Sequence, residues 1–215
     1  MTQFVFCHGW GFDAHFWHRL SPFFSREKCS FVDLGYFGHR TEHQFAGNQA
    51  IIGVGHSMGL SKLLSMHGHF HCLIGLNGFT HFLGSDQSIH RARTKELKAL
   101  RKSFAHDSIG TLKKFYERCG AKDFAETPDF SKLDAAVLLS DLQWLEKECT
   151  LPHVPTLILT SDDDVVVPLS ITSDNLSKHP WVTLGSIADT GHALGFCKPN
   201  EVYKKMMSFL DDRKP

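Results

Sequence analysis

Short apolar runs alternate with segments of helical periodicity along most of this 215-residue chain. This alternation is typical of βαβ units, in which parallel strands are joined by helices that cover the sheet. Strands are predicted over residues 4–7, 30–34, 50–54, 72–77, 156–160 and 181–187, and helices over 13–24, 58–66 and 200–210. We therefore expect an α/β fold built on a mostly parallel sheet.

One segment, residues 85–149, breaks the alternation because it lacks β-rich runs. It shows helical patterns over 89–104, 108–119 and 132–147. Segments inserted between the strands of such a sheet gather at its ends, and ligands bind outside the carboxyl ends of the strands. The sequence thus predicts a core formed by residues 1–84 and 150–215, with residues 85–149 inserted as a helical lid.

Composition excludes several classes of partner. Lysine plus arginine equals aspartate plus glutamate, 23 each, so no global field attracts nucleic acid. No apolar run approaches the roughly 20 residues of a membrane span, and the first residues lack the pattern of a signal peptide. Six scattered cysteines without a CxxC pair suit free thiols. We expect a cytoplasmic monomer that binds neither nucleic acid nor membrane.

Histidine is abundant, with fifteen residues, and His-Gly-His-Phe-His at 67–71 alternates as a metal-binding strand edge might. Zinc sites need three or four converging ligands, usually with longer spacers or cysteine partners. A polar helix end that runs into the next strand explains the pattern better. We expect no metal and no cofactor.

The pentapeptide Gly-His-Ser-Met-Gly at 55–59 lies between a predicted strand and a predicted helix. A tight strand-to-helix turn exposes a central serine as a nucleophile, and flanking glycines let the two arms of the turn approach. Ser57 is therefore the candidate nucleophile. The alternative is a structural turn with no catalytic role.

A serine nucleophile needs a base, and the base needs an orienting acid. Three aspartates follow the strand at 156–160, and we choose Asp164 as the acid because the chain turns at the Val-Pro that follows it, with Asp162 as the alternative. His192, in a glycine-flanked loop after the last strand, is the candidate base. The backbone N–H groups of Met58 and Trp10 would bind the oxyanion, although the segment at 8–11 could also be a plain tight turn.

These pieces together resemble the α/β-hydrolase superfamily over nearly the whole chain. The resemblance is carried by HGWG (8–11), DLGYFGH (33–39), GHSMG (55–59), SDDDVVVP (161–168) and TGHALGF (190–196). Within the superfamily the chain most resembles the carboxylesterases of biotin synthesis, which cleave the methyl ester of pimeloyl-acyl carrier protein; HGWGFDAHFWHRL (8–20) and TLKKFYERC (111–119) carry this likeness.

The resemblance implies an α/β-hydrolase fold with a helical lid, Ser57 as nucleophile, Asp164 as acid and His192 as base. It also implies that Trp10 and Met58 lie on the oxyanion side and that Phe115 lines the acyl pocket. Two features depart from the family pattern. The turn DLGYFGH lacks the usual proline, and the sequence starts directly on the strand before HGWG, so we expect a sheet that lacks the first two strands.

Positive charge is concentrated between residues 90 and 122, where ten Lys or Arg residues face three acidic ones. Acyl carrier proteins are acidic, and a field of this kind steers a negative partner and fixes its orientation. Arg91, Arg93, Lys114 and Arg118 are therefore candidate contacts for a carrier protein. The alternative is a solvated helix face with no partner.

We thus expect a serine carboxylesterase acting on the methyl ester of pimeloyl-acyl carrier protein in biotin precursor synthesis. A general short-chain acyl esterase or thioesterase would use the same triad. A receptor that kept the hydrolase fold as a ligand-binding pocket is the non-enzymatic alternative. Phe104 and Phe115 are expected either to line the acyl tunnel or to pack the lid against the core.

Overall fold

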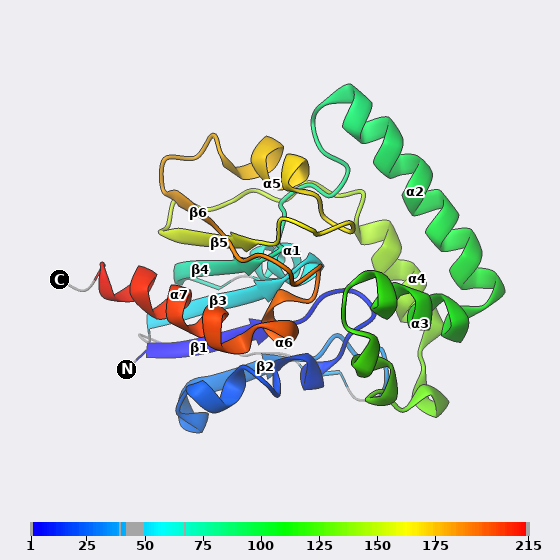
Figure 1. Ribbon diagram of the computed structural model, residues 1–215, viewed down its shortest axis with the longest axis horizontal. Helices are drawn as coiled ribbons and strands as arrows, with labels where there is room; N and C mark the ends of the chain where they lie inside the picture. The colour runs from blue at the N-terminus through cyan, green and yellow to red at the C-terminus, as the bar shows by residue number, and fades with distance from the viewer. Residues whose placement is uncertain (1, 39, 42–49, 67, 214–215) are drawn as a thin grey trace.

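The computed structural model describes residues 2–38, 40–41, 50–66 and 68–213, and its core is one twisted sheet (Figure 1). The strands are β1 (Thr2–Cys7), β2 (Cys29–Val32), β3 (Ala50–His56), β4 (Phe70–Leu76), β5 (Thr156–Thr160) and β6 (Val182–Ser186). They pair in the order β2-β1-β3-β4-β5-β6, and every pairing is parallel. The predicted parallel sheet is therefore confirmed.

The central strands are buried on both faces because helices cover the sheet from either side. Val5, Val54, Ile74 and Ile158 are completely buried. In Figure 1, α7 (Pro199–Asp211) lies in front of the sheet and α1 (Met58–Ser65) lies behind it. The chain leaves β1 toward one edge and returns as β3 on the other side of β1. In open sheets, this reversal marks the crevice in which ligands bind.

The segment after β1 differs from the prediction. The expected helix over residues 13–24 is replaced by short 3₁₀ helices, η1 (Ala14–Trp17) and η2 (Ser21–Phe23), followed by η3 (Arg26–Lys28). Pro22 prevents a continuous α-helix through to residue 24, because it has no N–H to donate and disfavours α-helical backbone at the residue before it. The apolar periodicity is still used, since Phe16 and Trp17 are completely buried.

The residues between β4 and β5 form helices beside the carboxyl ends of the strands (Figure 1). They comprise α2 (Gln87–His106), α3 (Ser108–Arg118), η4 (Lys122–Glu126), η5 (Phe130–Lys132) and α4 (Ala135–Trp144). Asp86, Asp107 and Asp134 cap the three α-helices, each by accepting backbone N–H groups of the first turn. The remaining helices are α5 (Leu169–Leu176) and α6 (Leu194–Cys197).

A buried ionic contact fastens α4 to the core. Asp141 accepts hydrogen bonds from the Tyr36 hydroxyl at 2.6 Å and from Lys62 Nζ at 2.5 Å. Lys62 lies on α1, and its ammonium also lies 4.1 Å from the centre of the Trp144 ring. Because little of either charged side chain reaches solvent, the pair needs all of these partners to offset the loss of hydration.

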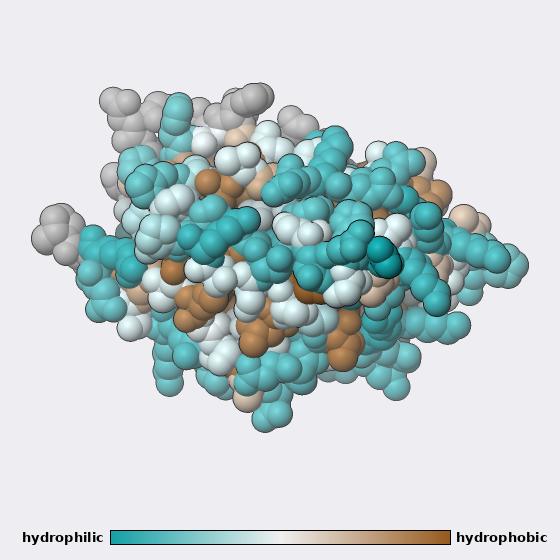
Figure 2. Space-filling model, turned by 90° about the horizontal axis from the view of Figure 1, so that it is seen from above, coloured by the Kyte–Doolittle hydropathy of each residue, from teal (hydrophilic) through white to brown (hydrophobic). Residues whose placement is uncertain are grey.

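The surface carries no large continuous apolar area on the face shown in Figure 2, where hydrophilic side chains separate small apolar patches. Within the described ranges, no helix is both long enough and apolar enough to cross a bilayer. The same ranges contain no cluster of three or more metal-binding side chains, and His67 lies outside them. All six cysteines are free.

Candidate active site

Ser57 occupies a strained turn between β3 and α1. Its backbone angles are φ 53° and ψ −126°, a conformation that residues other than glycine rarely adopt. The turn requires glycine on both sides of the serine, because a Cβ atom on Gly59 would lie 2.1 Å from the carbonyl oxygen of Cys7. A Cβ on Gly55 would lie 2.4 Å from the backbone of Leu60. Such backbone strain is typical of functional turns.

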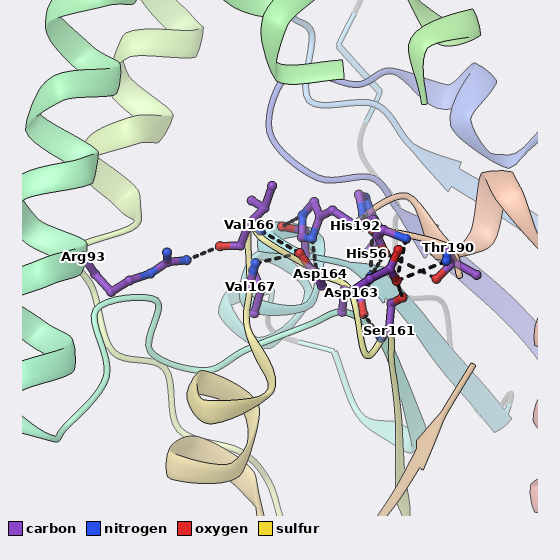
Figure 3. Close-up of polar contacts among 12 residues, drawn as sticks. His56, Arg93, Ser161, Asp163, Asp164, Val166, Val167, Thr190 and His192 are labelled. Atoms are coloured by element: carbon purple, nitrogen blue, oxygen red, sulfur yellow. Dashed lines mark hydrogen bonds and ion pairs between the residues drawn. The ribbon is translucent and has the colours of Figure 1, made fainter. Parts of the chain in front are cut away.

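His192 connects Ser57 to Asp164. Its Nε2 lies 2.8 Å from Ser57 Oγ. Its Nδ1 lies 2.7 Å from Asp164 Oδ2 (Figure 3). The other carboxylate oxygen accepts the N–H groups of Val166 and Val167, each at 2.8 Å. Because an ionised carboxylate only accepts, the imidazole proton lies on Nδ1, and Nε2 presents a lone pair to the serine hydroxyl.

The three consecutive aspartates have different environments. Asp164 is 5% exposed and contacts His192, whereas Asp162 is exposed to solvent. Asp163 accepts the N–H groups of Thr190 at 3.2 Å and Gly191 at 3.0 Å, and also a short hydrogen bond from the Ser161 hydroxyl. These bonds, with that from Ser161 the strongest, lower the pKa of Asp163. Asp163 therefore ties the turn after β5 (residues 161–168, the acid turn) to the loop after β6 that carries His192 (residues 187–193, the base loop).

His56, the residue before the serine, was not anticipated from the sequence. It is completely buried, and its Nε2 lies 3.0 Å from the backbone carbonyl oxygen of His192. Burial and the neighbouring His192 hold the pKa of His56 well below its ordinary value, so its ring is neutral. Since a carbonyl can only accept, the one ring proton of His56 lies on Nε2 and is donated to that oxygen.

The loop after β1 lies directly against the serine. A Cβ atom on Gly9 would lie 3.0 Å from Ser57 Cβ, so the next residue, Trp10, is held close to the nucleophile. The indole N–H of Trp10 donates to the carbonyl of Leu138 on α4 at 2.9 Å. Met58 begins α1, and the N–H groups of a first helical turn have no acceptor within the helix. Met58 directly follows Ser57, and Trp10 directly follows the glycine that packs against it; their role as oxyanion donors stays a prediction.

A cavity of about 350 Å³ lies between α2, α3 and the loop after β5. Its lining includes Phe82, Leu97, Phe115 and Val166. Phe115 is shared with the site, because its ring lies 5.1 Å from that of Trp10.

The second predicted aromatic of the tunnel is placed differently. Phe104 is completely buried against Trp10, with ring centres 5.5 Å apart, and it is absent from the lining of this cavity. For Phe104 the packing alternative therefore describes the structure. A larger hollow of about 560 Å³ lies along η1, η2 and β2, and its lining does not include Ser57, His192 or Asp164.

The predicted basic contacts do not form one group. Arg91, Lys114 and Arg118 are exposed, and the last two also line the cavity. Arg93 is only 5% exposed, which corrects the expectation that it meets a carrier protein. It lies on the face of α2 that packs against the core, and its guanidinium carbon lies 4.7 Å from the centre of the Phe82 ring.

Arg93 has two further polar partners, the side chain of Glu96 and the backbone of Val166. It pairs with Glu96 at 2.5 Å. It also donates a hydrogen bond to the backbone carbonyl of Val166 (Figure 3). Its charge is therefore directed at the acid turn and away from solvent.

No family sequence model matches this chain, and no curated protein matches it by sequence. Solved structures, however, match along almost its full length. An esterase from Exiguobacterium antarcticum aligns over 98% of this chain and 92% of its own, with a TM-score of 0.78 and 15% identity. A hydrolase from Oleispira antarctica aligns over 99% and 92%, with a TM-score of 0.78 and 13% identity.

The fold is that of the α/β-hydrolases. An epoxide hydrolase from Bacillus megaterium, aligned over 98% of this chain and 94% of its own, is also similar, with a TM-score of 0.76 and 17% identity. These proteins are named for different reactions. Since one fold supports many reactions, the likeness establishes the α/β-hydrolase fold, and the reaction must be argued from the site.

Proposed function

We propose that this protein is a serine carboxylesterase that forms an acyl-enzyme. The observation that carries the proposal is the continuous pair of contacts from Ser57 Oγ to His192 at 2.8 Å and from His192 to Asp164 at 2.7 Å. A serine hydroxyl is a weak nucleophile unless a base removes its proton, and this arrangement supplies an oriented base. The buried site also strengthens each electrostatic interaction that the reaction uses.

In the first half-reaction, Ser57 Oγ attacks the ester carbonyl carbon while its proton passes to His192 Nε2. The carbonyl oxygen becomes an oxyanion, which the backbone N–H groups of Met58 and Trp10 stabilise by hydrogen bonds. The bond to the alkoxy group then breaks, and His192 returns the proton to the departing alcohol. Asp164 holds the imidazole in place and stabilises its positive charge while it is protonated.

In the second half-reaction, a water molecule donates a proton to His192 Nε2 and attacks the acyl carbon. The second tetrahedral intermediate collapses with release of Ser57 Oγ, which takes the proton back from His192. The products are a carboxylic acid and an alcohol, and the free enzyme is restored. Donors aimed at a developing oxyanion typically contribute about 10² to 10³ in rate each, so both half-reactions depend on the same two N–H groups.

For the substrate we propose the methyl ester of pimeloyl-acyl carrier protein in the cytoplasm, in biotin precursor synthesis. Exposed Arg91, Lys114 and Arg118 support a negatively charged carrier, and the last two residues lie at the cavity that shares Phe115 with the site. Methanol is a small leaving group, so recognition would fall on the acyl chain and its carrier. The apolar lining of the cavity suits such a chain.

Covalent labelling tests the reaction class. A fluorophosphonate is expected to label the wild-type protein at Ser57, and Ser57→Ala is expected to show no label. Absence of labelling in the folded wild-type protein would refute the serine esterase proposal. Slow turnover of every ester tried, combined with tight binding of a ligand, would instead favour a receptor.

Charge reversal tests the carrier. The triple variant Arg91→Glu, Lys114→Glu, Arg118→Glu is expected to lose its preference for a carrier-linked ester over the free methyl ester, most strongly at low salt. The control reverses three exposed lysines outside this region: Lys178, Lys204 and Lys205.

Equal carrier preference in both triple variants would favour an esterase or thioesterase of small substrates. Ser57-dependent growth of a biotin-requiring strain that lacks its own methyl esterase would support the proposed pathway.

A further inference from the structure

Asn77, directly after β4, adopts an unusual backbone conformation at a fully packed position. Its φ is 49°, in the left-handed region, and the residue is 1% exposed. Its backbone N–H donates to the carbonyl of Leu159 at the end of β5, at 2.8 Å. Asparagine tolerates left-handed backbone better than most residues, but glycine does so at less cost. The presence of a side chain here therefore calls for an explanation.

The side chain of Asn77 uses both ends of its amide. Oδ1 accepts the N–H of Ser161 at 2.9 Å, while Nδ2 donates to the carbonyls of His192 at 2.8 Å and Gly191 at 3.1 Å. The orientation of the amide is fixed by these partners. The reversed amide would place its oxygen against two carbonyls and its NH₂ group against an N–H.

These bonds join the three segments that carry the proposed triad. Leu76, the preceding residue, accepts the N–H of Ser57 at 2.9 Å, which connects the turn of the nucleophile to the end of β4. Ser161 begins the acid turn, three residues before Asp164. His192 is held through its own backbone carbonyl, which also accepts the ring N–H of His56.

We propose that Asn77 is a positioning residue that sets the distance between the base loop and the acid turn. The inference rests on the proposed esterase function, because it concerns the same three groups. The contacts of His192 with Ser57 and Asp164 are both short, so a small displacement of its loop breaks one or both. Catalytic groups need to be held within about 0.5 Å of their productive positions, and a misplacement of about 1 Å can cost 10²-fold in rate.

Two substitutions separate the roles of this side chain. Asn77→Asp keeps the shape and an oxygen for the Ser161 N–H, but turns a carboxylate oxygen toward the carbonyls of Gly191 and His192. Asn77→Gly keeps the left-handed backbone without strain and removes the amide altogether.

Asn175→Asp is the matched control. Asn175 is an equally buried asparagine on α5, and its Oδ1 accepts the N–H groups of Thr80 at 3.0 Å and His81 at 2.6 Å. Its hydrogen bonds thus join α5 to the loop after β4 and involve neither the acid turn nor the base loop.

Both Asn77 variants are expected to lower kcat for a simple ester roughly 10- to 100-fold while KM changes less than about threefold. The rate of fluorophosphonate labelling should fall in parallel. The downfield proton resonance of the His192–Asp164 hydrogen bond should shift or broaden. The control should keep kcat, labelling rate and this resonance close to wild type, even at an equal loss of thermal stability.

Wild-type kcat and an unshifted resonance in folded Asn77→Gly would overturn the inference, whatever happens to Asn77→Asp. The same result for Asn77→Gly with only a lower Tm would show a purely structural role and would also overturn it. If the wild-type protein does not react with the fluorophosphonate, the esterase proposal fails. The proton resonance then still decides whether Asn77 positions His192 against Asp164.

Discussion

Replacing Asp164 by asparagine probes the group of the proposed triad that is furthest from substrate. One carboxylate oxygen accepts the N–H groups of Val166 and Val167, and the other lies 2.7 Å from His192 Nδ1. The asparagine oxygen can keep both backbone bonds, which turns its NH₂ group toward His192. A donor there requires a lone pair on Nδ1, so the ring proton moves to Nε2, where it meets Ser57 Oγ.

An imidazole with its proton on Nε2 cannot accept the proton of the serine. The corresponding change of tautomer in a serine protease lowers kcat by about 10⁴, or about 5.5 kcal/mol of transition-state stabilisation. Because the two backbone hydrogen bonds are kept, the free energy of unfolding should fall by no more than about 2 kcal/mol. Activity is therefore expected to disappear from a protein that remains folded.

Steady-state hydrolysis of a chromogenic ester at neutral pH measures this difference, with urea unfolding as the check on folding. Asp162→Asn is the matched control, because Asp162 is the exposed neighbour two positions earlier and should change kcat by less than about twofold. Comparable kcat values for Asp164→Asn and Asp162→Asn would refute the assignment of Asp164 as the acid.

Two further predictions concern stability. Asp141→Leu leaves the Lys62 ammonium largely buried without its carboxylate and is expected to lower the free energy of unfolding by about 3–5 kcal/mol, measured in urea; adding Lys62→Met should restore most of the loss. Burial keeps the pKa of His56 well below its ordinary value, so the unfolded chain binds a proton below about pH 6.5 that the folded chain does not, and stability falls with decreasing pH. His56→Gln removes that proton uptake and should lessen the decline by up to about 1.4 kcal/mol per pH unit; an unchanged slope would contradict the reasoning.

The fold could be predicted from the sequence because its strands are short, apolar and separated by helical periodicity. The parallel sheet follows from that alternation alone. The expected helix at 13–24 failed at Pro22, because a count of apolar positions ignores the missing N–H. Its apolar side chains reached the core by way of 3₁₀ turns instead.

The candidate site can be predicted because its residues follow the ends of strands, and strand ends can be recognised from short stretches of sequence. Ser57 and His192 follow strands, and the structure brings them together with Asp164. Asn77 carries no comparable signal, since one polar residue at a strand end predicts no particular partner. The two carbonyls that it meets belong to a loop more than a hundred residues away in the chain.

The net charge of the segment does not predict the position of Arg93, because it takes no account of which face of the helix carries each residue. Arg93, Leu97 and Phe104 recur at helical spacing on one side of α2, and all three are buried. That spacing can be seen in the sequence, and it places Arg93 on the apolar face of the helix. A buried charge on this face needs polar partners within the protein, here the half-exposed Glu96 carboxylate and the carbonyl of Val166.

The bonds between α4 and the core limit how this chain can recombine with others. Asp141 is the acceptor for the Lys62 ammonium, and the carbonyl of Leu138 is the acceptor for the indole of Trp10. In a chimera with a foreign segment between β4 and β5, the Lys62 ammonium and the Trp10 indole N–H would lose their acceptors. The free energy of unfolding would then fall by several kcal/mol. A foreign segment would be compatible only if it placed a carbonyl and, three residues later, a carboxylate at the positions of Leu138 and Asp141. The segment between β4 and β5 and the rest of the chain are therefore expected to be inherited together.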